Sequence, residues 1–357
     1  MMKAWEKNVR RTEPYVPGEQ PQAANLIKLN TNENPYPPAP GVKAVLRCTD
    51  AELLRRYPDP TAGALVRAIA DFHGFEEENV FVGVGSDDVL GMSFLTFFAG
   101  EKPILFPDIT YSFYDVWANL FRIPYERPAL DDDFRLREED YLRENGGIVI
   151  ANPNAPTSLA EPVSVIEKIA AGNPESVVIV DEAYVDFGGE SALPLVRRYD
   201  NVLVVRTFSK SRSLAGLRIG YAIGDPALIQ ALNAIKYSYN SYTMSAVTIA
   251  AGVASVEDRA YFEETCARVC ATREASKEAL SKLGFTFPDS KTNFIFAKHA
   301  SVPAAYLFAE LKKRNIYVRY FALPRIDNYL RITVGTPEEM ERLCAALAEI
   351  LEAYPGK

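Results

Sequence analysis

Residues 176–210 read SVVIVDEAYVDFGGESALPLVRRYDNVLVVRTFSK and contain two apolar runs of the kind that form buried strands. The first run ends at Asp181, and the second ends in a group of hydroxyl side chains around Lys210. Apolar runs with a helical stretch between them predict parallel strands covered on both faces. Ligands of such sheets bind at the carboxyl ends of the strands. The sequence therefore predicts a ligand site where a carboxylate and a lysine follow neighbouring strands.

The same pattern extends along most of the chain. From about residue 63, helical patterns alternate with further apolar runs, and the region 226–283 is largely helical. Short runs typical of antiparallel strands follow, and a last helix is predicted to begin at Pro337, after an N-cap at Thr336. The pattern predicts an α/β fold with a mostly parallel sheet and a smaller α+β lobe. We expect an N-terminal segment at 1–40 that packs on the small lobe, a large domain at 41–283 and a small domain at 284–357.

The composition limits the possible functions. The chain has 357 residues, 48% of them hydrophobic and 24% charged, as is typical of a globular protein. Its net charge of -8 argues against a nucleic-acid partner, although a few local arginines can still hold a small anion. The N-terminal residues lack the apolar core of a secretory signal, and no apolar run reaches the ~20 residues of a membrane helix. The four cysteines and two histidines are not spaced as a metal site or a disulfide framework, so we expect no metal and a cytoplasmic location.

Lys210 and Asp181 are the first candidates for chemistry. A fold tolerates a buried lysine mainly where a neutral amine is useful, for instance to bind an aldehyde cofactor. A carboxylate at a strand end is a ready partner for a protonated ring nitrogen, the phenol of Tyr184 can bond a ring oxygen, and Tyr111 can stack on a planar ring. Each has an ordinary alternative: Lys210 extending to solvent, Asp181 as a metal ligand or helix cap, Tyr184 as core packing and Tyr111 as a surface aromatic in a turn.

A second group of residues is typical of an anion site. Gly85 ends an apolar run and precedes Ser86, Asp87 and a helical pattern, so free backbone N–H groups at the helix start can hold a phosphate. Arg218 can bind the same phosphate through two hydrogen bonds, assisted by Ser209. A plain helix N-cap at Ser86 explains part of this pattern nearly as well.

These residues resemble the fold-type-I pyridoxal-phosphate aminotransferases, and among them most closely the histidinol-phosphate aminotransferases. The strings that carry the resemblance run in family order along the chain: LNTNENPYPP (29–38), RYPDP (56–60), GVGSDD (83–88), DITYSFY (108–114), NPNAPTS (152–158), VDEAYVDF (180–187), VVRTFSK (204–210), LAGLRIGY (214–221) and LRITVGTPEE (330–339). The resemblance implies an aspartate-aminotransferase-like fold with a seven-stranded-type, mostly parallel sheet, and pyridoxal 5′-phosphate as cofactor.

The resemblance also implies a role for each matching residue. Lys210 would form the internal aldimine and later move the proton between the substrate carbon and the cofactor. Asp181 would keep the pyridine nitrogen protonated, Tyr184 would bond the 3′ oxygen and Tyr111 would stack on the ring. The residues expected at the cofactor phosphate are Gly85, Ser86, Asp87, Ser209 and Arg218.

Two further positions depend on the resemblance. Tyr57 is expected to reach a phosphate in the partner subunit's site, which implies a homodimer; the sequence alone would place it in a proline-bounded turn. The family's loop usually has an asparagine where this chain has Ala155, so the amide that bonds the 3′ oxygen is missing there. Asn154 can supply it from one position earlier, or Tyr184 can act alone, since one neutral hydrogen bond is worth about 1 kcal/mol.

Three residues are expected to bind the substrate. Arg331 and Arg319 correspond to arginines that bind the substrate's anionic end, and Tyr15 can close over the same group. Two guanidinium groups fit a phosphate dianion, and they also fit a carboxylate with a second acid. A cross-strand ion pair on the sheet surface is the alternative explanation for Arg319.

The predicted reaction is the ping-pong transamination of L-histidinol phosphate with 2-oxoglutarate, in histidine biosynthesis, through an aldimine mechanism. An aromatic amino acid aminotransferase or a threonine-phosphate decarboxylase-like enzyme would share the fold and the arginines. From another class, a non-catalytic module that binds the cofactor is disfavoured by the acidic charge and by the presence of Lys210. A serine hydrolase is disfavoured because the chain has no G-x-S-x-G string.

Overall fold

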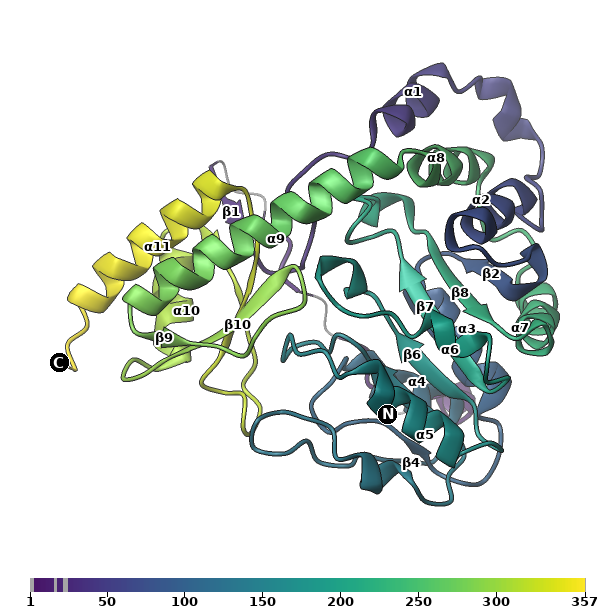
Figure 1. Ribbon diagram of the computed structural model, residues 1–357, viewed down its shortest axis with the longest axis horizontal. Coiled ribbons are helices and arrows are strands. Elements are labelled where there is room, and N and C mark those ends of the chain that lie inside the picture. The colour runs from purple at the N-terminus through teal and green to yellow at the C-terminus, as the bar shows by residue number, and fades with distance from the viewer. Residues whose placement is uncertain (1–2, 16–17, 22–24, 357) are drawn as a thin grey trace.

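The computed structural model describes residues 3–15, 18–21 and 25–356, which form two lobes (Figure 1). The large lobe contains a seven-stranded sheet in the order β2-β8-β7-β6-β5-β3-β4. Its strands are β2 (Val80–Gly83), β3 (Ile104–Leu105), β4 (Tyr125–Glu126), β5 (Ile148–Ala151), β6 (Val178–Asp181), β7 (Val202–Thr207) and β8 (Gly220–Gly224). All neighbours pair in parallel except β8, which is antiparallel to both β2 and β7. The α/β fold with a mostly parallel sheet is therefore confirmed.

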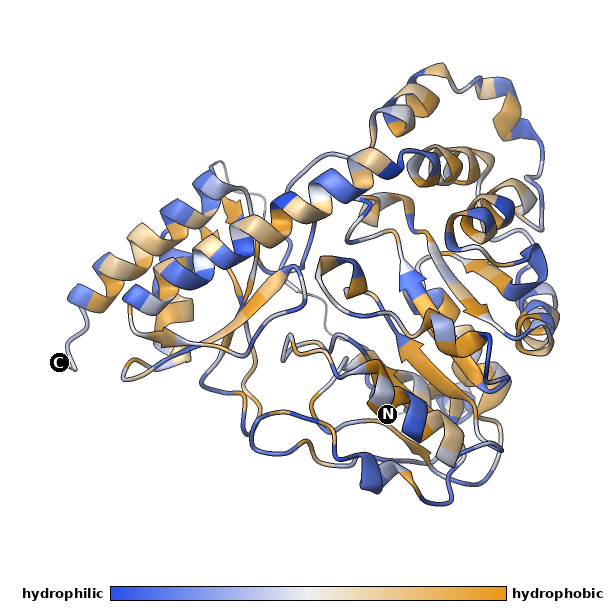
Figure 2. Ribbon diagram, in the orientation of Figure 1, coloured by the Kyte–Doolittle hydropathy of each residue, from blue (hydrophilic) through white to orange (hydrophobic). Residues whose placement is uncertain are grey.

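Helices cover both faces of this sheet, as the continuous apolar strands predict. The helices of the large lobe are α1 (Pro40–Cys48), α2 (Gly63–His73), α3 (Ser86–Phe97), α4 (Phe113–Phe121), α5 (Val163–Gly172), α6 (Leu193–Val196), α7 (Pro226–Tyr239) and α8 (Ala246–Glu257). Successive residues of a strand point to opposite faces. In β6, Val178 and Val180 join the core beneath α2, α5 and α8, whereas Ile179 joins the core beneath α3, α4 and α7. Figure 2 shows the resulting hydrophobic colour of β6 against the mixed colours of the helices.

The small lobe consists of short strands packed against two helices. Its elements are β9 (Phe285–Thr286), β10 (Phe294–His299), α10 (Ala304–Lys313), β11 (Ile316–Tyr317), β12 (Arg319–Tyr320), β13 (Leu330–Thr333) and α11 (Pro337–Glu352). The sheet order is β12-β13-β10-β9, and every pair in it is antiparallel. The last helix begins as predicted, because Thr336 and Glu339 cap each other's backbone N–H groups and Pro337 occupies the first turn.

Two segments connect the lobes. The N-terminal segment contributes β1 (Ile27–Lys28), which pairs in parallel with β11 of the small lobe. Helix α9 (Arg259–Lys282) runs from one lobe to the other: Tyr261 packs against the core of the large lobe, and Val269 and Leu280 are buried in the core of the small lobe (Figure 1). The domain boundaries at 40 and 283 stay a prediction.

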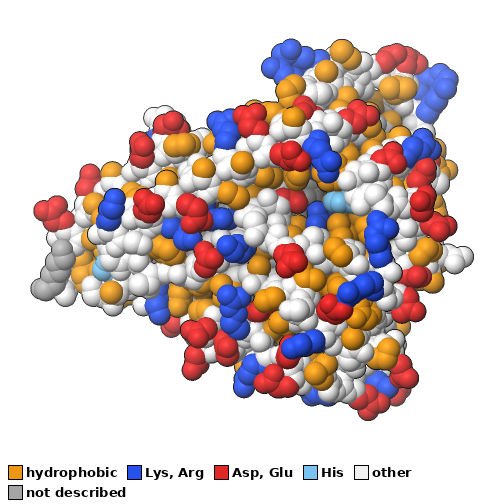
Figure 3. Space-filling model, viewed as in Figure 1, with side chains coloured by type: hydrophobic (Ala, Val, Ile, Leu, Met, Phe, Trp, Pro, Cys, Tyr) orange, Lys and Arg blue, Asp and Glu red, His pale blue; other side chains and the backbone are white. Residues whose placement is uncertain are grey.

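Single-turn helices complete the secondary structure: η1 (Ala4–Asn8), η2 (Ala51–Arg55), η3 (Glu77–Asn79), η4 (Glu138–Tyr141), η5 (Val185–Phe187) and η6 (Ala215–Leu217). Acidic and basic side chains are interspersed over the face shown in Figure 3. Within the described ranges, no helix has both the length and the apolar character that crossing a membrane requires.

Candidate active site

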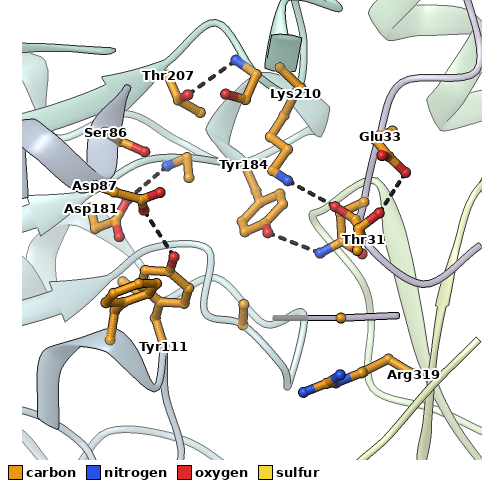
Figure 4. Close-up of a pocket in the computed structure, with 18 of the residues that line it drawn as sticks. Thr31, Glu33, Ser86, Asp87, Tyr111, Asp181, Tyr184, Thr207, Lys210 and Arg319 are labelled. Carbon is orange, nitrogen blue, oxygen red and sulfur yellow. Dashed lines mark hydrogen bonds between the residues drawn. The ribbon is translucent and has the colours of Figure 1, made fainter. Parts of the chain in front are cut away.

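A cavity of about 460 Å³ opens at the carboxyl ends of the large sheet and reaches the small lobe (Figure 4). Most of the predicted site residues line it: Tyr15, Ser86, Asp87, Tyr111, Asp181, Tyr184, Ser209, Lys210, Arg218, Arg319 and Arg331. They come from the N-terminal segment, from α3, from the connection between β3 and α4, from the segments at the ends of β6 and β7, from the turn before β8 and from the small lobe. The topology thus brings together residues that are more than 300 positions apart in the chain.

Lys210 projects into the middle of this cavity (Figure 4). It follows β7 in a turn in which Thr207 Oγ1 accepts a hydrogen bond from the Ser209 backbone N–H, at 3.1 Å. Lys210 Nζ donates to the backbone oxygen of Thr31, at 3.0 Å, and lies 5.9 Å from the centroid of the Tyr184 ring. Among the described residues no carboxylate forms an ion pair with Lys210, and its Nζ is hydrogen-bonded to a backbone oxygen.

Asp181 ends β6 and is 5% exposed. Its Oδ2 accepts a hydrogen bond from the Tyr114 hydroxyl, at 2.8 Å, and its Oδ1 accepts one from the Ala183 backbone N–H, at 3.2 Å. Burial raises the pKa of Asp181 to about 6, although these two hydrogen bonds act in the opposite direction. No cationic side chain of the described residues pairs with this carboxylate. A cationic group of a ligand would therefore be bound strongly here.

The anion site consists of Gly85, Ser86, Asp87, Ser209 and Arg218, which meet where α3 begins. Gly85 has a φ of 90°, and a Cβ there would lie 2.5 Å from Arg218 Nη2, so only glycine fits the turn. Arg218 donates to Ser209 Oγ at 3.3 Å and to Asp87 Oδ2 at 3.2 Å. Free N–H groups at the start of α3 beside a guanidinium form a site for a phosphate.

Two tyrosines flank the space between Lys210 and Asp181. The Tyr111 hydroxyl donates to Asp87 Oδ1 at 2.9 Å, and the Tyr184 hydroxyl accepts from Asn32 Nδ2 at 2.9 Å (Figure 4). Burial raises the pKa of Tyr111 well above its usual value, so its hydroxyl stays protonated and acts as a donor.

Three predicted residues do not line the cavity: Gly85, which belongs to the turn of the anion site, Asn154 and Tyr57. Asn154 uses its amide elsewhere: Nδ2 donates to the Ile109 backbone oxygen and to Thr157 Oγ1, and Oδ1 accepts from Thr110 Oγ1. In the same loop Ala155 lines the cavity. The Asn154 side chain is therefore held by its own loop and by residues 109 and 110, and its replacement of the amide missing at position 155 stays a prediction.

Tyr57 is 81% exposed and follows η2. Its ring lies 4.5 Å from that of Tyr242, measured between centroids. Asp59, two residues on, accepts hydrogen bonds from the backbone N–H groups of Thr61 and Gly63, and Lys236 Nζ donates to the Pro60 backbone oxygen. The loop that carries Tyr57 is thus held firmly, with the tyrosine on the surface.

Arg319 and Arg331 face each other across two antiparallel strands, β12 and β13. Both guanidinium groups lie 5.5 Å from the centroid of the Phe321 ring. The ion-pair explanation for Arg319 does not hold, because its cross-strand partner is another arginine. Like charges directly opposite each other are destabilising unless an anion lies between them.

The environment of Arg331 supports the same conclusion. Its Nη2 donates to the Asn30 backbone oxygen at 3.0 Å, but its Nε is buried without a hydrogen-bond partner among the described residues. Burial lowers the pKa of Arg331, and the charge of Arg319 contributes in the same direction. Tyr15 lines the same end of the cavity, with its ring stacked on Phe113 at 4.2 Å between centroids. An anionic group would satisfy the unpaired donor and relieve the repulsion.

Sequence reasoning missed two side chains that matter in this geometry, Asn32 and Tyr114. Both lie within strings that carry the resemblance, 29–38 and 108–114, but neither adjoins an apolar run that would mark it as a strand end. Only the packing of the N-terminal segment and of α4 brings them to Tyr184 and Asp181.

The comparisons with known proteins agree with this site. A model of the family described as aminotransferase class I and II matches residues 24–347, and the chain belongs to this family. A histidinol-phosphate aminotransferase of Aromatoleum aromaticum is 52% identical over 355 residues, which cover 98% of this chain and 100% of that relative. A histidinol-phosphate aminotransferase of Acinetobacter baylyi is 53% identical over 349 residues, 97% of each chain.

Solved structures show the same fold. The crystal structure of histidinol-phosphate aminotransferase from Sinorhizobium meliloti in complex with pyridoxal-5'-phosphate has a TM-score of 0.84 and 25% identity to this chain. The match covers 92% of this chain and 91% of that one. The aspartate-aminotransferase-like fold and the resemblance that the motifs indicated are thus confirmed.

The close packing of β8 behind the anion site generates a stability prediction. A Cβ at Gly220 would lie 2.3 Å from backbone atoms of Gly85 and Ser86, whereas one at Gly216 would meet nothing within 4 Å. Gly220→Ala is expected to lower the free energy of unfolding by about 1–3 kcal/mol, because backbone must move to admit the methyl group. Urea unfolding of the cofactor-free protein measures this, with Gly216→Ala as the matched control. Equal stabilities for the two variants would show that β8 does not constrain this turn.

Proposed function

We propose that this chain is a pyridoxal-phosphate-dependent aminotransferase that moves the amino group of L-histidinol phosphate to 2-oxoglutarate. The observation that carries the proposal is the pairing of Arg319 with Arg331 in the same cavity as Lys210. The cavity thus has a reactive amine at Lys210 and, separately, a site for a dianion between the two arginines. Relatives that are 52% and 53% identical over nearly the full chain are named histidinol-phosphate aminotransferases.

The residues present fit the cofactor. Asp181 is a buried carboxylate that has no cationic partner in the described part of the chain, as a protonated ring nitrogen requires, and the anion site suits the cofactor's phosphate. Lys210 lines the same cavity, and its amine can bind the aldehyde group of the cofactor. When bound, pyridoxal phosphate supplies an electron-withdrawing ring that weakens the bonds at the substrate's α carbon.

Each side chain then has a defined task. With the cofactor bound, Asp181 would hold the positive charge of the ring nitrogen, Tyr111 would pack against the ring and Tyr184 would bond the ring oxygen. Lys210 moves a proton at the α carbon of the substrate, as a general base and then a general acid. The donors for the cofactor's phosphate are the N–H groups of Ser86 and Asp87 together with Ser209 and Arg218.

Substrate choice depends on the other end of the cavity. Arg319 and Arg331 bind the phosphate of histidinol phosphate, and Tyr15 closes over it. The same pair takes a carboxylate of 2-oxoglutarate in the second half of the cycle, since both are anions that accept paired hydrogen bonds from guanidinium groups. One site thus serves two substrates in turn.

A homodimer completes the proposal. Large apolar side chains are exposed on α1, on η2 and around the end of α7: Leu46, Leu53, Leu54, Tyr57, Tyr239 and Tyr242. Clusters of exposed apolar residues of this kind mark protein interfaces. A second copy of the chain that covers this surface would bring Tyr57 of the partner subunit to the cofactor's phosphate.

The proposal predicts how the visible absorption of the cofactor-loaded protein responds to substrates. L-histidinol phosphate should bleach the band of the lysine-bound cofactor, and 2-oxoglutarate should restore it. Lys210→Ala should abolish turnover, and its bound cofactor should lack that band. Phenylalanine and threonine phosphate serve as the comparison donors.

Other outcomes would change the assignment in distinct ways. Bleaching by phenylalanine alone would keep the cofactor and Lys210 but replace the substrate. Release of carbon dioxide from threonine phosphate would make the protein a decarboxylase. Near-normal turnover by Lys210→Ala would contradict the mechanism itself.

The dimer proposal predicts complementation between two defective chains. Tyr57→Phe removes one hydrogen bond to a phosphate, so cofactor affinity should fall about 10-fold or more. Mixing Tyr57→Phe chains with inactive Lys210→Ala chains should restore one intact site in each hybrid dimer, since Lys210 and Tyr57 would then come from different subunits. Activity at limiting cofactor measures the recovery.

The matched control is Tyr239→Phe, another exposed tyrosine, which should leave cofactor affinity unchanged. If mixing gives no recovery although hybrid dimers form, Tyr57 does not act in the partner's site.

A further inference from the structure

Tyr114 lies behind the cavity and is fully buried in α4. Its ring packs among aromatic side chains, with centroids 5.8 Å from Phe106 and 5.7 Å from Tyr111. It is not among the residues that line the cavity. Its hydroxyl donates to Asp181 Oδ2 at 2.8 Å, with both partners buried.

The packing of Tyr114 does not require its hydroxyl. A phenylalanine would fill the same space in this apolar cluster, and burying a hydroxyl costs free energy unless it is hydrogen-bonded. The partner of this hydroxyl is Asp181, which faces the cavity from the end of β6. The presence of tyrosine at position 114 is therefore explained by the carboxylate.

The surroundings of Asp181 show why the carboxylate needs this donor. Asp87 on α3 and the adjacent Glu182 carry the same charge and act with burial to raise the pKa of Asp181. The hydrogen bonds from Tyr114 and from the Ala183 N–H lower it. Burial, together with the charge of Asp181, raises the pKa of Tyr114 well above its usual value, so the proton stays on the phenol. Tyr114 is thus the only side chain among the described residues that donates to Asp181.

We propose that Tyr114 is a positioning residue that holds the Asp181 carboxylate, as an anion, in place for the ring nitrogen of the cofactor. The inference rests on the proposed function, since it requires a cofactor with a protonated ring nitrogen. Tyr114 acts through Asp181 and does not reach the substrate. Its removal should therefore weaken cofactor binding and lower kcat, with little change in KM.

Tyr114→Phe tests this with a matched control. The control is Tyr141→Phe, since Tyr141 is equally buried but its hydroxyl has no hydrogen-bond partner among the described residues. Loss of a hydrogen bond to a charged group predicts a dissociation constant for pyridoxal phosphate about 10- to 100-fold higher in Tyr114→Phe and unchanged in Tyr141→Phe. Fluorescence titration of cofactor-free protein measures both, and thermal unfolding checks that Tyr114→Phe, which keeps every ring contact, is folded.

A double-mutant cycle separates positioning from general stability. In an Asp181→Asn background, Tyr114→Phe should change the dissociation constant by less than about 2-fold, because the carboxylate that it serves is gone. Equal losses in both backgrounds, or wild-type affinity in Tyr114→Phe, would overturn the inference. Failure of the wild-type protein to bind the cofactor would instead overturn the proposed function.

Discussion

The site depends on a carboxylate at the end of a central strand, buried without a cationic partner among the residues that the structure describes. Asp181 lies where β6 ends, and burial raises its pKa from 3.8 to about 6. Ionising this carboxyl in the folded protein therefore costs about 3 kcal/mol more than ionising an exposed aspartate. The parallel sheet makes this position possible, because it aligns the end of β6 with the end of β7 and hence Asp181 with the turn that carries Lys210. A protonated ring nitrogen would stabilise the ionised carboxylate and so offset this cost.

An excess of positive charge lies at the other end of the cavity. Arg319 and Arg331 are opposed across β12 and β13, and Arg331 has a buried donor for which the described residues supply no partner. Asp181 is held by the large sheet, and the two arginines are held by the sheet of the small lobe. Two ligand charges of opposite sign, a ring nitrogen and a substrate phosphate, would neutralise them separately. This division explains how one cavity can hold a permanent cofactor and an exchangeable substrate.

Much of this arrangement was accessible from the sequence. Apolar runs located six of the seven strands of the large sheet, and the Thr336–Glu339 pair located the start of α11. The two-residue strands β1 and β4 are not predicted, because neither lies in an uninterrupted apolar run like the one at 103–106 that marks the equally short β3. Residues that follow a strand, such as Asp181 and Lys210, could be assigned to one edge by topology alone.

Side chains that reach the site through tertiary packing could not be predicted in this way. Tyr114 lies on a helix whose orientation decides which ring meets Asp181. The amide of Asn154, which the sequence suggests as a replacement for the one missing at Ala155, is held by hydrogen bonds to Ile109 and Thr157 that the sequence does not reveal. The pairing of Arg319 with Arg331 is a matter of strand register, which a single sequence does not reveal.

The most direct test of this account is the stability of Asp181→Asn with and without pyridoxal phosphate. Above pH 7 the wild-type carboxylate is ionised at a cost, and the cost disappears as the pH falls below about 4. The cofactor-free variant should therefore be at least as stable as the wild-type protein at pH 8, and it should gain less stability from the cofactor. A cofactor-free variant that is clearly less stable at pH 8, yet gains as much from the cofactor as the wild-type protein does, would contradict the account.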